Sequence, residues 1–205
     1  MRERFNEDLD HVKSISKEVM AYVISSYDKL SQYLGEADEE NLKDILELNE
    51  DIRRKATMME RLCFELMALQ QPVAKDLKLL QMAMKLASSY KRIGAHFEQI
   101  ALILMEYSLN DSEKDYVNKL IDNEKKMAID SIDSFIKIDK DLARKTIDAD
   151  KINNDLFKEA VEFIARENKN DDIRPVELAE KVLLYKYFER LGDRLARVGD
   201  LATRL

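Results

Sequence analysis

Mostly apolar side chains near the start of the chain recur at steps of three and four residues, the spacing that places them on one face of an α-helix. The chain also has few residues that could close tight turns, because only 4 Gly and 2 Pro occur among its 205 residues. A many-stranded sheet would need more of them. The sequence therefore predicts an all-α protein made of long helices. The predicted face of the first helix is Phe5, Leu9, Val12, Ile15, Val19, Tyr22, Ser26, Leu30 and Tyr33.

Three helices are predicted in the first half of the chain. The first ends near Gly35, and the second runs from there to about Leu69 with a break near Asn49. Pro72 is expected to open the third helix, which reaches roughly Ser108, because the missing N–H of a proline would have no partner in a first helical turn.

Three more helices are predicted in the second half. Asn110–Glu113 has the pattern of a turn followed by an N-cap and an acidic first turn. A polar loop over 168–172 is expected before Pro175, which is expected to open the last helix. The three helices are placed at about 112–138, 141–168 and 175–205.

Two pairs of short segments indicate that the second half repeats the first. Arg92-Ile93-Gly94 is matched 98 positions later by Arg190-Leu191-Gly192, and Glu50–Arg53 is matched 100 positions later by Asp150–Asn153. Nearly equal offsets are typical of an internal repeat. The alternative is two unrelated helical hairpins that match by chance. We predict two tandem three-helix bundles, at 1–109 and 110–205.

Charge and cysteine content limit the partners and the compartment. With a formal net charge of −7, no nucleic acid partner is expected, because phosphate backbones are bound by positive patches. Cys63 is the only cysteine, so we expect no disulfide within the chain, a small core residue and a reducing compartment. No run of about 18 apolar residues occurs. We expect a cytoplasmic protein without direct membrane insertion.

The sequence lacks the side-chain groupings of an enzyme. His11 and His96 stand apart from any Ser or Cys nucleophile motif, and no Gly-rich phosphate loop is present. A ferritin-like di-iron centre would need Glu-x-x-His on two helices, which the chain does not have. We expect a non-enzymatic protein.

Two of the glycines fall inside predicted helices and mark the residues of most interest. Gly94 and Gly192 each cost about 1 kcal/mol relative to alanine in a helix interior, which indicates close approach of a neighbouring helix. Glu189 and Asp193 are four residues apart beside Gly192, so their like charges lie on one helix face and repel.

Two explanations of this acidic pair remain open. A metal ion held by oxygen ligands would relieve the repulsion, with Asp150 and Asn153 completing the site from the neighbouring helix. The alternative is a purely structural face, in which nearby arginines neutralise the carboxylates and Asp193 pairs with Arg197. The arginines are Arg190, Arg194 and Arg197.

Three segments carry motifs of a known family. Phe188–Leu195 reads Phe-Glu-Arg-Leu-Gly-Asp-Arg-Leu, its first-repeat counterpart Tyr90–Phe97 reads Tyr-Lys-Arg-Ile-Gly-Ala-His-Phe, and Gln71–Lys78 reads Gln-Pro-Val-Ala-Lys-Asp-Leu-Lys. Together they resemble the helix motifs of the PhoU family of phosphate-signalling regulators. The resemblance spans nearly the whole chain, since its length and tandem repeat agree as well.

The resemblance implies a negative regulator of the phosphate-starvation response and of phosphate uptake. Such a protein is a non-enzymatic adaptor between a phosphate-specific ABC transporter and a sensor histidine kinase. The implied partners are the ATPase subunit of the transporter and the kinase, and the implied assembly is a homodimer. The alternatives are a metal-free helical adaptor and a PhoU-like paralogue with another regulatory role.

The resemblance also implies a metal site, because family members bind metal through a Glu-x-x-x-Asp pair in each repeat. Here the pair is Glu189 and Asp193, whereas Lys91 and Ala95 stand at the matching positions of the first repeat. A charged lysine and an alanine offer no ligand to a cation. A metal ion (iron, zinc, manganese or magnesium) is therefore expected in the second repeat only.

Overall fold

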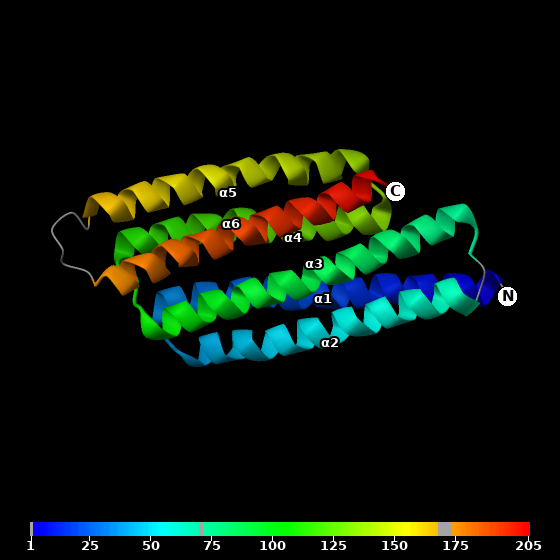
Figure 1. Ribbon diagram of the computed structural model, residues 1–205, viewed down its shortest axis with the longest axis horizontal. Coiled ribbons are helices and arrows are strands. Elements are labelled where there is room, and N and C mark those ends of the chain that lie inside the picture. Colours follow the sequence, from blue (N-terminus) through cyan, green and yellow to red (C-terminus); the bar gives the residue numbers. More distant parts are fainter. Residues whose placement is uncertain (1, 70–71, 168–173) are drawn as a thin grey trace.

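The computed structural model describes residues 2–69, 72–167 and 174–205. These residues form six α-helices and no strand, which confirms the all-α prediction (Figure 1). The helices are α1 (Arg2–Glu36), α2 (Glu40–Leu69), α3 (Ala74–Glu106), α4 (Asp111–Lys137), α5 (Lys140–Glu167) and α6 (Pro175–Thr203).

Two predicted helix boundaries are wrong. α2 runs through Asn49 without a break, because this residue is buried and its amide Nδ2 donates to Glu98 Oε2 on α3 at 2.9 Å. A polar residue that has a partner inside the bundle does not need to end the helix. Pro72 lies two residues before α3, and extended Val73 is the N-cap residue.

The other helix signals of the second half agree with the structure. Pro175 is the first residue of α6, as expected for a proline at a helix start. Asn110 caps α4 through a capping box, in which its side chain accepts from Glu113 N while the Glu113 carboxylate accepts from Asn110 N. The loop predicted over 168–172 lies outside the described residues.

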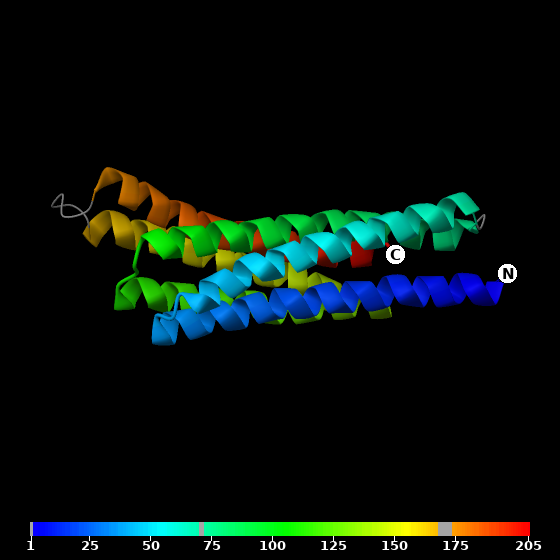
Figure 2. The same ribbon diagram turned by 90° about the horizontal axis from the view of Figure 1, so that it is seen from below.

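The helices lie side by side along one long axis in two sets of three (Figure 1). Within the first set α2 packs on α1 and α3, and within the second α4, α5 and α6 pack on one another. The sets meet along two lines of contact, α3 with α6 and α1 with α4 (Figure 2). The chain passes from one set to the other between α3 and α4, and the division at 109 and 110 stays a prediction.

The core is continuous across both sets. The inward face predicted for α1 is buried, apart from the half-buried Tyr22 and Tyr33. Complete burial of one large apolar side chain contributes about 1.5–3 kcal/mol, so the fully buried rings contribute much of the stability. Cys63 is also fully buried, which confirms its predicted place in the core. The largest buried rings are Tyr27, Tyr90, Tyr185, Phe97 and Phe188.

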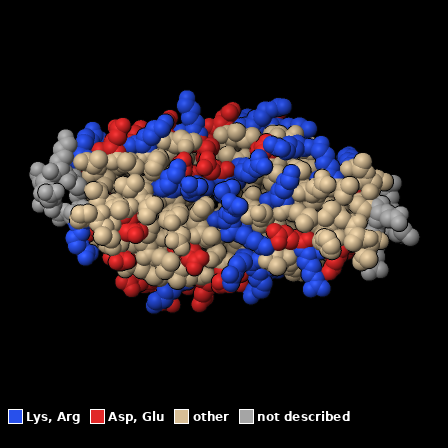
Figure 3. Space-filling view, in the orientation of Figure 1, with Lys and Arg blue, Asp and Glu red and all other residues tan. Residues whose placement is uncertain are grey.

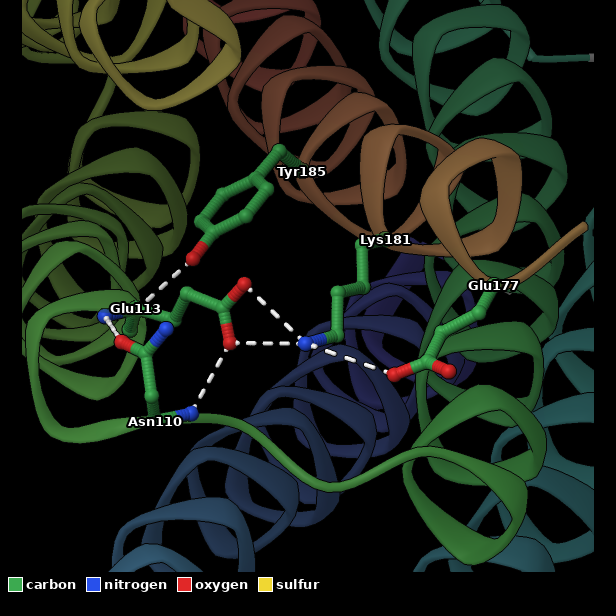
Figure 4. A network of polar contacts seen from close by, with 5 residues as sticks. All are labelled: Asn110, Glu113, Glu177, Lys181 and Tyr185. Carbon is green, nitrogen blue, oxygen red and sulfur yellow. Dashed lines mark hydrogen bonds and ion pairs between the residues drawn. The ribbon is translucent and has the colours of Figure 1, made fainter. Parts of the chain in front are cut away.

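A buried polar network ties the start of α4 to α6 (Figure 4). Lys181 Nζ lies 3.1 Å from Glu113 Oε1 and 3.0 Å from its Oε2, and the two side chains are 6% and 2% exposed. Tyr185 donates its hydroxyl to the backbone oxygen of Glu113 at 2.9 Å. Glu113 thus takes part both in the N-cap of α4 and in the contact of α4 with α6.

None of the helices in the described part of the chain combines the length and the apolar character that crossing a membrane requires.

Candidate functional site

The predicted site residues come together where α5 packs on α6. A Cβ atom on Gly192 would lie 2.2 Å from Asn153 Nδ2 and 2.5 Å from Asp150 Oδ1. Carbon atoms do not approach polar atoms so closely, so only a glycine leaves room for both side chains. The close approach predicted for Gly192 is confirmed, and it places Asp150 and Asn153 against the helix face that carries Glu189 and Asp193.

An acidic cluster lies where α5 and α6 meet, made of Asp150 from α5 and Glu189 and Asp193 from α6. Burial raises the pKa of Asp150, and the negative charges of Asp193 and Glu189 raise it further. Burial also raises the pKa of Asp193, and the charge of Glu189 adds to that effect. The ionised carboxylates therefore destabilise one another, and an added cation would relieve this repulsion.

A lysine, not an arginine, contacts the acidic cluster. Lys186 Nζ lies 2.6 Å from Glu189 Oε2, one turn away on α6. The expected pair between Asp193 and Arg197 is not formed, because Arg197 Nη1 lies 2.6 Å from Asp200 Oδ2 instead. Arg194 and Arg190 act on Asp193 at longer range, where they lower its pKa.

Asn153 is fully buried and has polar partners on both sides of its amide. Its Oδ1 accepts from Asn123 Nδ2 at 2.8 Å, and its Nδ2 approaches Asp150 Oδ1 at 3.4 Å. Asp150 Oδ2 also accepts from Asn154 Nδ2 at 3.0 Å. Among the described residues no three His, Cys, Asp or Glu side chains converge as a ready ligand set. A metal ion held by the Asn153 oxygen would compete with the hydrogen bond from Asn123.

One acidic residue near the cluster was not predicted from the sequence. Glu124 on α4 is fully buried, and burial together with the charge of Asp150 raises its pKa well above the ordinary value, against the hydrogen bond from Tyr27. Tyr27 of α1 donates to Glu124 Oε2 at 2.9 Å, which joins the two helix sets. The available signal was a carboxylate on the apolar stripe of α4, between Ile121 and Met127.

The matching face of the first repeat has different chemistry. A Cβ atom on Gly94 would lie 2.4 Å from Asn49 Oδ1 and 3.2 Å from Ile52 Cγ2. The residues that face this glycine are therefore Asn49 and Ile52, one position before the predicted counterparts Glu50 and Arg53. The latter two are exposed and pair with each other, so the predicted alignment of these segments is shifted by one residue.

Lys91 stands where the second repeat has Glu189. Its Nζ lies 2.6 Å from Glu60 Oε2 of α2, so its charge is already paired across the helix contact. Ala95 stands where the second repeat has Asp193. The first-repeat face thus holds one ion pair and a hydrogen bond from Asn49 to Glu98 in place of an acidic cluster.

The fold and the two glycine-centred contacts define a protein of two tandem helical repeats. The PhoU domain model matches the chain twice, over residues 16–104 and 117–203. The chain therefore belongs to the PhoU family, as the motif resemblance implied.

Curated relatives match over most of their length. The chain is 25% identical over 199 residues to phosphate-specific transport system accessory protein PhoU homolog 1 of Methanothermobacter thermautotrophicus, with 96% of this chain and 91% of that protein covered. It is 27% identical over 170 residues to the PhoU homolog of Aquifex aeolicus, with 80% and 77% covered. The solved structure of PhoU from Pseudomonas aeruginosa shares the fold, with a TM-score of 0.88 at 22% identity over 97% of this chain and 96% of that one.

Proposed function

We propose that the protein is a negative regulator of the phosphate-starvation response and of phosphate uptake. In this role it is a non-enzymatic adaptor between a phosphate-specific ABC transporter and a sensor histidine kinase. The observation that carries the proposal is the double match to the PhoU domain, which covers both helix sets. Relatives that align over nearly the whole chain are named accessory proteins of the phosphate-specific transport system, which supports the same role.

The proposed partners are the ATPase subunit of the transporter and the sensor kinase. We place the protein in the cytoplasm as a homodimer. A rigid helical bundle suits an adaptor, because its two helix sets can present separate surfaces held in a fixed relation by the contacts of α1 with α4 and α3 with α6. No catalytic step is assigned to any residue.

Deletion of the gene in its host tests this proposal. Phosphate-starvation genes should be expressed in phosphate-replete medium after the deletion, and expression of the chain in trans should restore repression. Unchanged expression in a strain without a paralogue would contradict the proposal and favour another regulatory role. A pull-down should recover the ATPase subunit or the kinase, and recovery of neither would remove the adaptor mechanism.

We further propose that a metal ion binds at the acidic cluster of the second repeat. Glu189 and Asp193 of α6 would hold it, with Asp150 and the oxygen of Asn153 from α5. The support is the raised pKa of Asp150 and Asp193, to which burial and the negative charges nearby contribute, since a cation would lower that repulsion. Iron, zinc, manganese and magnesium are the candidates, and such an ion would be structural or regulatory.

Metal content of purified variants tests the site. Glu189→Gln combined with Asp193→Asn should abolish the bound metal and leave the helix content intact. The matched control is Asp155→Asn combined with Glu159→Gln, which removes an exposed acidic pair of the same spacing on α5. Full metal content in the first double variant, or equal loss in both, would favour the alternative of a metal-free helical adaptor.

A further inference from the structure

A cationic pocket lies between α3 and α6, where the two helix sets meet. Its volume is about 260 Å³, and it is distinct from the acidic cluster, which faces α5. Figure 3 shows Lys and Arg side chains gathered across the middle of the face that α3 and α6 form in Figure 1. We call this space the cationic pocket; its lining residues are Lys85, Ser88, Ser89, Arg92, Arg194 and Arg197.

The positive charges of the cationic pocket are poorly compensated within the protein. Lys85, Arg92 and Arg194 form no ion pair with any residue in the described ranges, and only Arg197 has one, with Asp200. Arg53 and Arg144, by contrast, each pair with an acidic side chain one turn away on the same helix. Like charges gathered without partners repel, so an anion would stabilise them.

Arg194 carries the clearest sign of a missing partner. Its Nε atom is buried and has no hydrogen-bond acceptor in the described part of the chain. Burial lowers the pKa of Arg194, and the charge of Arg92 lowers it further, with Asp193 opposing the shift. A buried donor without an acceptor is costly, so the protein itself does not fully compensate the Arg194 guanidinium group.

The donors suit an oxyanion with several acceptor oxygens. A guanidinium presents a planar fork of N–H groups that binds phosphate oxygens in pairs, and an ammonium adds a point charge. The hydroxyl of exposed Ser88 makes no hydrogen bond to a described residue and can donate as well, whereas Ser89 already donates to the Lys85 carbonyl. A volume of 260 Å³ exceeds the roughly 30 Å³ of a water molecule severalfold.

We propose that the cationic pocket binds a free phosphate-type oxyanion, inorganic phosphate or a small polyphosphate. Lys85 and Arg92 hold it from α3, and Arg194 and Arg197 hold it from α6. Because the protein carries a net charge of −7, general attraction of anions is unfavourable, and binding depends on this local grouping. A bound oxyanion bridges the two repeats, so it stabilises the contact of α3 with α6.

Calorimetric titration of the metal-free full chain with inorganic phosphate and with pyrophosphate tests the proposal. The variant is Arg92→Gln with Arg194→Gln, and the control is Arg53→Gln with Arg144→Gln, which removes the same charge from exposed sites on α2 and α5. We expect saturable binding that weakens at least about tenfold in the variant and is unchanged in the control, because each charge-assisted hydrogen bond contributes enough for about that factor.

Thermal unfolding gives a second readout that a merely structural role would not produce. In phosphate-free buffer the variant should be at least as stable as the parent, since it removes two like charges, but only the parent and the control should gain stability from added phosphate. Absence of saturable binding, or equal weakening in variant and control, would overturn the proposal. Binding only to vesicles of anionic phospholipid would overturn it in favour of a lipid headgroup.

The proposal depends on the geometry of the pocket and not on the regulatory role proposed above. Binding is measured with purified protein, whereas the role is measured in a deletion strain, so either can fail alone.

Discussion

The buried ion pair between Lys181 and Glu113 allows a quantitative test of the second helix set. Lys181→Met keeps the length and packing of the side chain but leaves the Glu113 carboxylate, 2% exposed, without a cation. Breaking a buried pair by removing one partner costs about 3–5 kcal/mol. The Asn110 backbone N–H and the N-terminus of α4 still stabilise the carboxylate, so we expect about 3 kcal/mol, at the low end of that range.

Urea and thermal unfolding followed by circular dichroism measure this loss. For a chain of this size about 3 kcal/mol corresponds to a fall of about 6–12 °C in the melting temperature. The control Lys137→Met removes an exposed lysine whose Nζ lies 2.6 Å from Asp133 Oδ2, and an exposed pair contributes only about 0–1 kcal/mol. Adding Glu113→Gln to Lys181→Met should restore most of the loss, because glutamine can still accept from Asn110 N.

Two outcomes would refute this reasoning. If Lys181→Met lowers the free energy of unfolding no more than Lys137→Met, the pair is not effectively buried. If the double variant is as unstable as Lys181→Met, the loss comes from the lysine's own packing and not from an uncompensated charge.

Three further predictions concern single residues. The pKa of Glu124 is raised in the folded state, so the free energy of unfolding is highest below the ordinary pKa of 4.5, where this carboxyl group is protonated, and falls as pH rises. In urea unfolding, Glu124→Gln should therefore be more stable than the metal-free parent at pH 7 and equal to it below about pH 4.5. Burial and the charges of Arg194, Arg190 and Arg92 lower the pKa of His96 to about 4, so NMR titration should show a neutral ring down to that pH. The free energy of unfolding should fall as pH decreases from about 6.5 towards 4, because the unfolded state then binds a proton that the folded state does not. A titration midpoint near 6.5 would refute the burial argument. Ile138 follows α4 with a φ of 55°, a left-handed backbone conformation that is strained for isoleucine but not for glycine. Ile138→Gly should therefore raise the free energy of unfolding by about 1 kcal/mol. A lower free energy of unfolding would show that packing of the partly exposed side chain outweighs the backbone strain.

The fold could be predicted from the sequence because helix formation is mostly local. The spacing of apolar residues predicted the buried face of α1. The starts of α4 and α6 were predicted from the capping box of Asn110–Glu113 and from Pro175, signals that involve only neighbouring residues. The errors arose where a distant partner decides the outcome. From its residue type alone, Asn49 was predicted to interrupt the helix. In the structure it donates a hydrogen bond to Glu98, which lies 49 residues later in the chain and could not be identified as its partner from the sequence.

The candidate sites divide in the same way. The gathering of the four predicted site residues was inferred from a glycine inside the last helix, which indicates close approach of a neighbouring helix, and from the acidic pair beside it. These residues are Glu189, Asp193, Asp150 and Asn153. The first-repeat counterparts of Asp150 and Asn153 are displaced by one residue from the predicted positions. Glu124 meets Tyr27 across 97 positions and between different repeats, so no motif or offset within a repeat connects them. The cationic pocket likewise takes its residues from α3 and α6. Arg92 and Arg194 lie in the two copies of the repeated helix motif but at different positions of it, so the motif alone does not bring their side chains together.

The two repeats share a backbone plan but divide their charges differently. In each, a glycine of the third helix admits polar or branched side chains of the second helix, so this contact is preserved. In the second repeat the flanking positions are Glu189 and Asp193, and in the first they are Lys91, paired with Glu60, and Ala95. The arginines Arg92 and Arg190, by contrast, are kept at both positions. The cationic pocket lies where α3 meets α6. It takes Lys85 and Arg92 from the first repeat and Arg194 and Arg197 from the second, so both repeats contribute to its positive charge.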